Sequence, residues 1–325
     1  MITFWFAVLV LAWVLYFVLE GFDFGVGILT FLGRDEHERG AALRTIGPFW
    51  DGNEVWLVAA VGVTFAAFPD WYAALMSALY LPMVAILLLL AIRGVALEFR
   101  GKHDTPSWRR RADLLLAVSS TGIVLLWGAV LGILVDGLAL GADGEVTGTG
   151  LGRSLSPLLT PAAGLGALAA LLGAVLLGAT FLALRTTGPV RRRARDVARH
   201  TGTAGAVTLL LIGIGTGSRL TLAAAAVVFA AGLLARRTRE GLSFAAVALS
   251  VAATVVAVFT AHGDVVLRST LDPAWSLTRS GAAAGPEALR LITIAGVLIL
   301  PGVLVYQAWS YWVFRRRVAS ERVAS

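Results

Sequence analysis

The sequence predicts an all-α, polytopic membrane protein, and three observations lead to that prediction. Apolar residues make up 58% of the 325 residues, and charged residues only 14%. The mean hydropathy is +0.82, and the apolar residues come in long blocks rather than in alternation. Several blocks reach the length of about 18 residues that a membrane span needs, and a helix satisfies its own backbone hydrogen bonds in lipid.

Nine transmembrane helices can be drawn, and no long linker separates them, so we expect a single integral membrane domain over residues 1–325. The first lacks the positive segment of a signal peptide and is interpreted as a retained span. The seventh is short and alanine-rich, and without it the count would be eight. The helices are expected at residues 3–32, 51–68, 71–98, 113–140, 157–184, 199–217, 220–235, 242–262 and 288–313.

The lysines and arginines indicate which side of the membrane each terminus faces. Of these 27 residues, 21 lie in the C-terminal tail or in the loops after spans one, three, five and seven, and five lie in the opposite loops. Cytoplasmic loops carry such an excess. We therefore expect the N-terminus outside and the C-terminus in the cytoplasm. Because the positive charge lies in short loops, the net charge of +7 does not indicate a nucleic-acid partner.

The first span contains two carboxylates, Glu20 and Asp23, which are three residues apart and so share one helical face. A carboxylate at the centre of a bilayer costs about 2.5 to 3.5 kcal/mol on insertion scales. Spans therefore keep such residues where they line water, find a partner or carry protons. A functional role is favoured for both acids.

The second span opens with Asp51, Asn53 and Glu54, between Trp50 and Trp56. Asp51 or Asn53 could simply cap this helix, with Glu54 completing a capping box. A cap explains one acid and leaves the acid pair of the first span unexplained. A functional cluster is therefore preferred over capping alone.

The predicted orientation brings these acids to one side of the membrane. Spans one, two and three are joined by short loops, so they should pack together. Their ionisable groups should then gather in one vestibule that faces the cytoplasm. The expected members are Glu20, Asp23, Asp51, Glu54, Arg93 and Glu98.

Glycines and tryptophans have simpler interpretations. Trp71 is expected to be an anchor at the membrane interface, and Trp56 to fill the core or to act beside the acids. Gly21, Gly25 and Gly27 could pack closely or admit a partner. Glycines in spans five and six favour close helix approach: Gly164, Gly166, Gly173, Gly178, Gly213, Gly215 and Gly217.

The sequence contains few residues suited to binding a metal or to nucleophilic catalysis. It has no cysteine, which excludes disulfides and thiolate sites. Its four histidines lie in loops or at span ends, at positions 37, 103, 200 and 262, so no haem or metal site is expected. No nucleophile elbow, phosphate loop or zinc-protease motif occurs. The remaining candidates are acids and arginines, which in membranes relay protons, bind cations or neutralise one another.

Five motifs in chain order resemble subunit II of cytochrome bd quinol oxidases, and the resemblance covers the whole chain. The first two are specific, and the last is partly an aromatic pattern that any final span could show. The motifs are GFDFGVG at 21–27, IGPFWDGNEVWL at 46–57, AFPDWYAA at 67–74, RGVALEFRGK at 93–102 and VYQAWSYWVFRRRV at 305–318.

The resemblance implies a multi-pass protein of the bacterial cytoplasmic membrane, with two four-helix bundles and one peripheral helix. It implies a non-haem subunit of a quinol:oxygen oxidoreductase that stabilises subunit I, which holds haem b and haem d. This chain would line access routes for protons and dioxygen. A structural quinone in this chain and a small accessory membrane subunit stay open, and quinol and membrane lipid are further expected partners.

The resemblance also assigns roles to individual residues. Asp51 and Asp23 match acids of the proton path, and Trp56 matches a tryptophan near the oxygen passage. Family members often carry Asp before the first Gly of GFD, whereas this chain has Glu20, which keeps the charge and lengthens its reach. The full expected proton path comprises Asp51, Asp23, Glu20, Glu54, Arg93 and Arg100.

Two alternatives belong to other classes. A proton-coupled secondary transporter should show broken helices in both halves, whereas the acids here cluster in spans one to three. A purely structural assembly subunit would keep full turnover when Asp51 is replaced by Asn.

Overall fold

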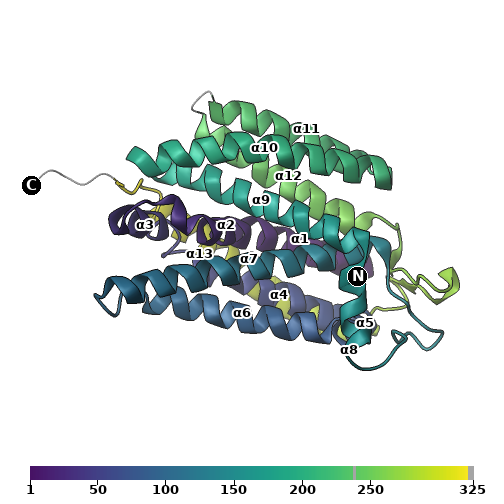
Figure 1. Cartoon of the computed structure of the whole chain (residues 1–325). Coiled ribbons are helices and arrows are strands. Elements are labelled where there is room, and N and C mark those ends of the chain that lie inside the picture. The colour runs from purple at the N-terminus through teal and green to yellow at the C-terminus, as the bar shows by residue number, and fades with distance from the viewer. Residues whose placement is uncertain (237–238, 321–325) are drawn as a thin grey trace, which may run out of the picture.

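The computed structural model describes residues 1–236 and 239–320, and most of its long helices lie side by side in roughly the same direction (Figure 1). The helix α3 lies at one end of the molecule, and the helix α8 with the loops around it lies at the other. Arg237 and Arg322, which contribute to the predicted excess of cytoplasmic charge, lie outside the described residues.

The first span is confirmed, but it is not a uniform α-helix. The helix α1 (Ile2–Leu15) passes into a π-helical turn, η1 (Tyr16–Glu20), and continues as α2 (Gly21–Ile28) and a 3-10 turn, η2 (Leu29–Leu32). A π turn inserts extra residues into the helix and is often found at functional sites. Here it ends at Glu20, directly before the segment with Asp23.

The second and third spans are separated by a sharp turn. The helix α4 (Trp50–Ala67) is followed by α5 (Pro69–Ala78), and the two are bent by 119° relative to each other. Pro69 starts α5, since a proline fits the first turn of a helix and disfavours helical geometry in the residue before it. The expectation of one helix over 71–98 is therefore wrong at its beginning, because the long helix α6 starts only at Tyr80 and ends at Phe99.

Trp71, on α5, is not an interface anchor as expected. It is almost fully buried and stacks on Phe6, with their ring centroids 6.5 Å apart. Phe68 and Phe259 meet it edge-on. The turn at Pro69 folds this tryptophan into the core.

The remaining elements follow the predicted order closely. The expected loops at 141–156 and 263–287 contain short structured pieces, including a two-stranded antiparallel sheet. The elements are α3 (Glu36–Leu43), α7 (Pro106–Asp136), α8 (Gly150–Leu155), η3 (Ser156–Leu159), α9 (Pro161–Arg185), α10 (Gly188–Thr216), α11 (Arg219–Arg236), α12 (Glu240–Thr260), β1 (Val265–Leu267), η4 (Pro273–Trp275), β2 (Leu277–Thr278) and α13 (Pro286–Val313).

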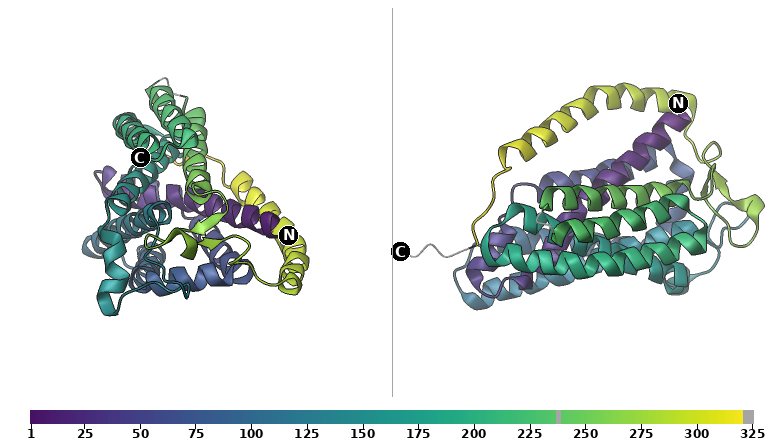
Figure 2. Two further views of the ribbon diagram at one scale, coloured as in Figure 1. Left: turned by 90° about the vertical axis from the view of Figure 1, so that its right-hand side faces the viewer. Right: turned by 90° about the horizontal axis from the view of Figure 1, so that it is seen from above.

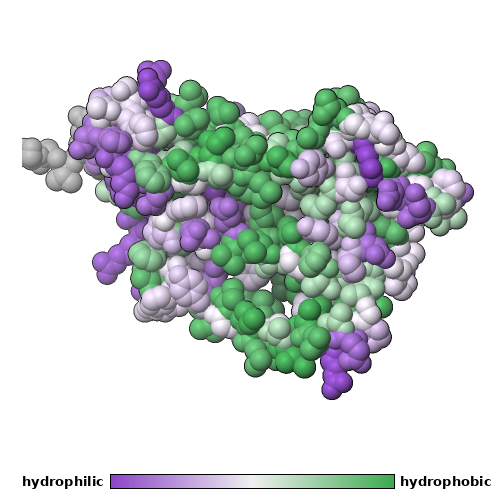
Figure 3. Space-filling view, turned by 90° about the horizontal axis from the view of Figure 1, so that it is seen from below, coloured by the Kyte–Doolittle hydropathy of each residue, from purple (hydrophilic) through white to green (hydrophobic). Residues whose placement is uncertain are grey.

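Within the described residues, seven helical segments are long and apolar enough to cross a membrane, and the bent pair α4 and α5 adds an eighth if it is one span. The shorter apolar helix Arg219–Ala235 lies among them. On the face shown in Figure 3, apolar residues spread over the middle, and hydrophilic residues gather mostly toward the two ends. The chain is therefore a multi-span membrane protein.

Close glycine contacts join the first span to α9. A Cβ atom at Gly25 would lie 1.9 Å from the carbonyl oxygen of Ala174, and one at Gly178 would lie 2.3 Å from the backbone of Gly25. Only residues without a Cβ atom fit at these two positions, and small residues of this kind allow helices in lipid to approach closely. The prediction of close approach is confirmed at Gly178 and wrong at Gly164, where an added Cβ would meet nothing within 4 Å.

The last helix, α13, stands apart from the others. Figure 2 shows it running along one edge of the molecule, with its first turns near the N-terminus of the chain. Trp5 Nε1 donates a hydrogen bond to Thr293 Oγ1 at 3.0 Å near that end. Most α13 side chains are exposed in the isolated chain.

Candidate functional site

A buried ion pair links the first span to α6. Arg93 Nη1 lies 2.5 Å from Glu20 Oε1, and both side chains are completely buried. The Arg93 guanidinium also lies over the ring of Phe24, 4.8 Å from its centroid. Unpaired charges in an apolar interior are very costly, so each group requires the other.

Two further acids connect this pair to the surface. Glu54 Oε2 lies 4.0 Å from Arg93 Nη1, and the Glu54 side chain is 29% exposed. Asp51, one turn earlier on α4, is exposed. The carboxylates therefore become progressively more buried from Asp51 to Glu54 to Glu20.

The fourth acid, Asp23, is completely buried and is held by Asn53. Asn53 Nδ2 donates a hydrogen bond to Asp23 Oδ2 at 2.7 Å. The capping alternative fails, because Phe49 is the N-cap of α4 and no side chain caps that helix. The amide of Asn53 instead donates its hydrogen bond to Asp23.

Several atoms of this cluster have no hydrogen-bond partner among the described residues. They include Oε2 of Glu20 and Oδ1 of Asp23. A buried carboxylate oxygen without a donor is available to accept a proton. No group of three or more acids or histidines suited to a metal ion occurs in the described part of the chain. The unpartnered oxygens thus leave the cluster able to accept protons.

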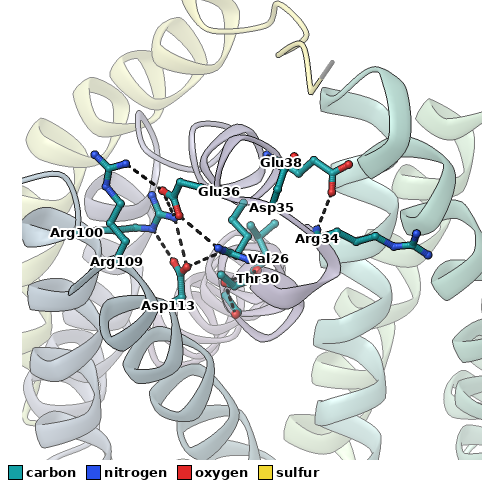
Figure 4. Close-up of polar contacts among 11 residues, drawn as sticks. Val26, Thr30, Arg34, Asp35, Glu36, Glu38, Arg100, Arg109 and Asp113 are labelled. Carbon is teal, nitrogen blue, oxygen red and sulfur yellow. Dashed lines mark hydrogen bonds and ion pairs between the residues drawn. The ribbon is translucent and has the colours of Figure 1, made fainter. Parts of the chain in front are cut away.

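Arg100 lies in a different cluster from the one expected, at the end of α6. Its Nε donates to Asp113 Oδ1 at 2.6 Å, and its Nη2 lies 2.9 Å from Glu36 Oε1. Arg39 Nε approaches the same buried Asp113 at 3.0 Å. Figure 4 shows Asp113 and Glu36 beside Arg100 and Arg109. This α3–α7 cluster joins α3 to α6 and α7.

Glu98, expected in the vestibule, lies elsewhere. Its side chain is exposed, and Oε1 lies 3.9 Å from Lys102 Nζ. The structure thus brings together five of the six expected groups, namely Glu20, Asp23, Asp51, Glu54 and Arg93, although Asp51 lies at the exposed edge.

A second acid on α3, Glu38, ties the loop to α10. Arg193 donates hydrogen bonds from Nη1 and Nη2 to its two carboxylate oxygens, each at 2.8 Å. These hydrogen bonds hold the pKa of Glu38 below its usual range, although partial burial opposes them. The loop helix is therefore fastened on both sides, to α7 through Asp113 and to α10 through Glu38.

Trp56 points into the core one turn after the acids. Its side chain is buried, and its Nε1 has no hydrogen-bond partner among the described residues. A separate apolar cavity of about 440 Å³ lies between the first span and the helices α7, α9, α10 and α12. Phe24 and Trp127 line one part of it, and Asp136 and Thr216 are among its few polar groups.

The histidines do not form a haem site. His262 Nε2 hydrogen-bonds the Val135 carbonyl at 2.7 Å, and His200 Nδ1 hydrogen-bonds the Asp196 carbonyl at 2.7 Å. Met76 and Met83 pack against the apolar core. His37 lies on the short helix α3 and His103 in the loop between α6 and α7, outside the long helices, so the donor set does not fit a haem held within the bundle.

Three polar residues of the site were given no role from the sequence. Asn53 was recognised as part of the polar segment that opens the second span and as a possible cap. Gln307 and Tyr311, which hydrogen-bond Asn53 Oδ1, were noted only as parts of a motif. Gln307 and Tyr311 are four residues apart in an apolar helix, a spacing that puts both polar groups on one face. That spacing was a signal in the sequence.

Comparisons with known proteins agree over nearly the full length. The family model for cytochrome bd terminal oxidase subunit II matches residues 1–314. The cytochrome bd ubiquinol oxidase subunit 2 of Bacillus subtilis is 35% identical, over 97% of this chain and 96% of its own length. The cytochrome bd-I ubiquinol oxidase subunit 2 of Escherichia coli K12 is 29% identical, over 94% and 92%.

A solved structure has the same fold. The bd oxidase from Geobacillus thermodenitrificans matches with a TM-score of 0.74 and 20% identity, over 96% of this chain and 98% of that one.

Proposed function

The chain belongs to the cytochrome bd terminal oxidase subunit II family, and we propose that it lines a proton route from the cytoplasm toward dioxygen reduced in subunit I. The relatives are subunits of ubiquinol oxidases, so this chain is a subunit of a membrane-bound quinol oxidase complex. Protons would enter at Asp51 and pass by Glu54 to Glu20 and Asp23.

The observation that carries this proposal is the graded burial of the acids around one arginine. Asp51 is exposed, Glu54 is partly exposed, and Glu20 is buried against Arg93. Arg93 would stabilise each carboxylate as it loses its proton, without holding that proton itself. Arg100 would act from the rim of this route, because its ion pairs with Glu36 and Asp113 hold the α3–α7 cluster in place.

Replacing Asp51 with Asn in the complete oxidase tests this proposal. Oxygen consumption per haem should fall by about tenfold or more if Asp51 admits protons. The reduced-minus-oxidised visible spectrum should be unchanged, because the substitution is at an exposed site. Unchanged turnover would support the purely structural alternative.

The haems of the complex, which supply the reduction of dioxygen, are proposed to lie in subunit I. The donor set of this chain supports that assignment, since His200 and His262 hydrogen-bond backbone carbonyls. A structural quinone fits this chain better. The cavity of about 440 Å³ has an apolar lining suited to an isoprenoid tail, with Asp136 and Thr216 available to the ring.

We further propose nine membrane spans in a single domain, with the N-terminus outside and the C-terminus in the cytoplasm. The seven long segments, the bent pair and the short helix α11 supply the nine spans. The first span, α4, α6 and α7 would form one four-helix bundle, and α9 to α12 the other. The helix α13 would be the additional peripheral helix.

Subunit I is proposed to cover α13 and the neighbouring face of α4. Helices in lipid associate through close packing, and α13 makes few such contacts within this chain. Docking there would stabilise subunit I and place Trp56 near a passage for dioxygen. A small accessory subunit, quinol and lipid would meet the remaining membrane surface.

A further inference from the structure

The only asparagine of the chain and its only glutamine hydrogen-bond to each other. Gln307 Nε2, on α13, donates to Asn53 Oδ1, on α4, at 2.8 Å. The Tyr311 hydroxyl donates to the same oxygen at 2.8 Å. Gln307 and Tyr311 lie one turn apart, so one face of α13 binds one carbonyl oxygen.

The other end of the Asn53 amide faces the first span. Its Nδ2 donates to Asp23 Oδ2 at 2.7 Å and to the Leu19 carbonyl oxygen at 3.4 Å. A carbonyl oxygen can only accept, so Leu19 fixes which end of the amide points toward it. All four hydrogen-bonding positions of Asn53 are therefore used, and its orientation is set from both sides.

This orientation makes the two oxygens of Asp23 different. Oδ2 accepts from Asn53, whereas Oδ1 is buried and has no partner among the described residues. A carboxyl group donates through one oxygen and accepts through the other, so a proton on Asp23 is directed to Oδ1. The charged or titratable groups around Asp23 are Glu20 in its own span, Glu54 on α4, Arg93 on α6 and Tyr311 on α13.

We propose that Asn53 is a positioning residue that couples the seating of α13 to proton transfer through Asp23. If α13 moves away, the Oδ1 atom of Asn53 loses its two hydrogen-bond donors, Gln307 and Tyr311, and the Asn53 amide is free to rotate. Asp23 Oδ2 then loses its fixed hydrogen-bond donor. A proton on Asp23 is no longer directed to Oδ1 and can bind either carboxylate oxygen. Because α13 has few other contacts in this chain, its seating depends on the assembled complex. The inference rests on the proposed function and adds that the proton route is complete only after assembly.

A double-mutant cycle on the complete oxidase tests this coupling. Asn53→Ala should lower oxygen consumption per haem by about tenfold, as expected for loss of a hydrogen bond to a charged group. The same substitution should have no further effect when Asp23 is already Asn. Two effects that simply multiply would overturn the inference. Full turnover in Asp23→Asn alone would instead refute the proposed proton route, and the infrared measurement below would still decide the inference.

Infrared difference spectroscopy provides the second readout, on milder variants that act from α13. The carboxyl band that disappears in Asp23→Asn identifies Asp23. That band should shift in Gln307→Leu and in Tyr311→Phe. It should not shift in Tyr306→Phe, a matched control because Tyr306 is 61% exposed on the same helix. A band that stays unchanged in both test variants, or that moves equally in the control, would overturn the coupling.

Discussion

The two halves of the molecule pack their helices through different kinds of residue. In the half formed by α9 to α12, small residues meet, as at Gly202 and Gly232, and Ser243 and Ser250 donate to backbone carbonyls of α11. Its buried acid, Glu240, lies at the start of α12 with Arg191 and Arg195.

The half formed by the first span, α4, α6 and α7 buries ions in its interior instead. Glu20 and Arg93 lie at 0% exposure. Among the described residues of α9 to α12, the buried charged side chain is Glu240, and it lies at a helix end rather than in the interior. The proposed proton route accounts for this difference, because the acids of the first half would be kept for their chemistry, at a cost to stability.

The largest effect should follow from removing the positive charge of the first half. Arg93→Ala leaves Glu20 buried without its partner, a change that typically costs about 3 to 5 kcal/mol. We expect little assembled oxidase in membranes, measured by haem absorbance and by co-purification of subunit I. Arg110→Ala, at an exposed arginine, is the control and should assemble normally. Normal assembly of Arg93→Ala would mean that the ion pair is dispensable for the fold.

A smaller effect is expected at the contact between the halves. Gly25→Ala forces a Cβ atom against the Ala174 carbonyl, and such overpacking costs about 1 to 3 kcal/mol. The thermal unfolding midpoint of the purified complex should fall. Gly164→Ala adds the same methyl group where nothing lies within 4 Å and should leave the midpoint unchanged. Equal midpoints for the two variants would contradict the close packing of α2 on α9.

The smallest effect concerns the pair that fastens α3 to α10. Because Arg193 lowers the pKa of Glu38, the pair contributes stability above the pKa of an unfolded glutamate, about 4.3. This contribution, about 1 kcal/mol, is lost as the pH falls through the lower pKa of the folded protein. Glu38→Gln should therefore lower the unfolding midpoint at pH 7, and the difference from the unmodified protein should shrink toward pH 3. A difference that is constant with pH would exclude the ion pair as its cause.

Much of the fold could be predicted, because apolar blocks determine where membrane helices lie. The long helices agree with the expected spans, whereas the break at Leu79, between α5 and α6, was overlooked within the continuous apolar run 71–98. Trp71 was interpreted as an interface anchor, because a tryptophan near the end of a span usually is one. Only the backbone turn shows that its ring faces the core.

The site was predicted in part, for a different physical reason. Acids are conspicuous in apolar spans, so Glu20 and Asp23 were recognised at once. Arg100 was misplaced, because the sequence does not show that Asp113 and Glu36 lie within its reach. Asn53 and Gln307 depend on a contact between residues that are 254 positions apart, which no local pattern reveals.

The most direct test substitutes one buried acid in each half by its uncharged isostere. Glu20→Gln and Glu240→Gln both keep the side-chain shape, and both acids face arginines. Oxygen consumption per haem d should fall by about tenfold or more in Glu20→Gln, because an amide cannot relay a proton, and should be unchanged in Glu240→Gln. Full turnover in Glu20→Gln, or an equal loss in both variants, would contradict a proton route through the first half.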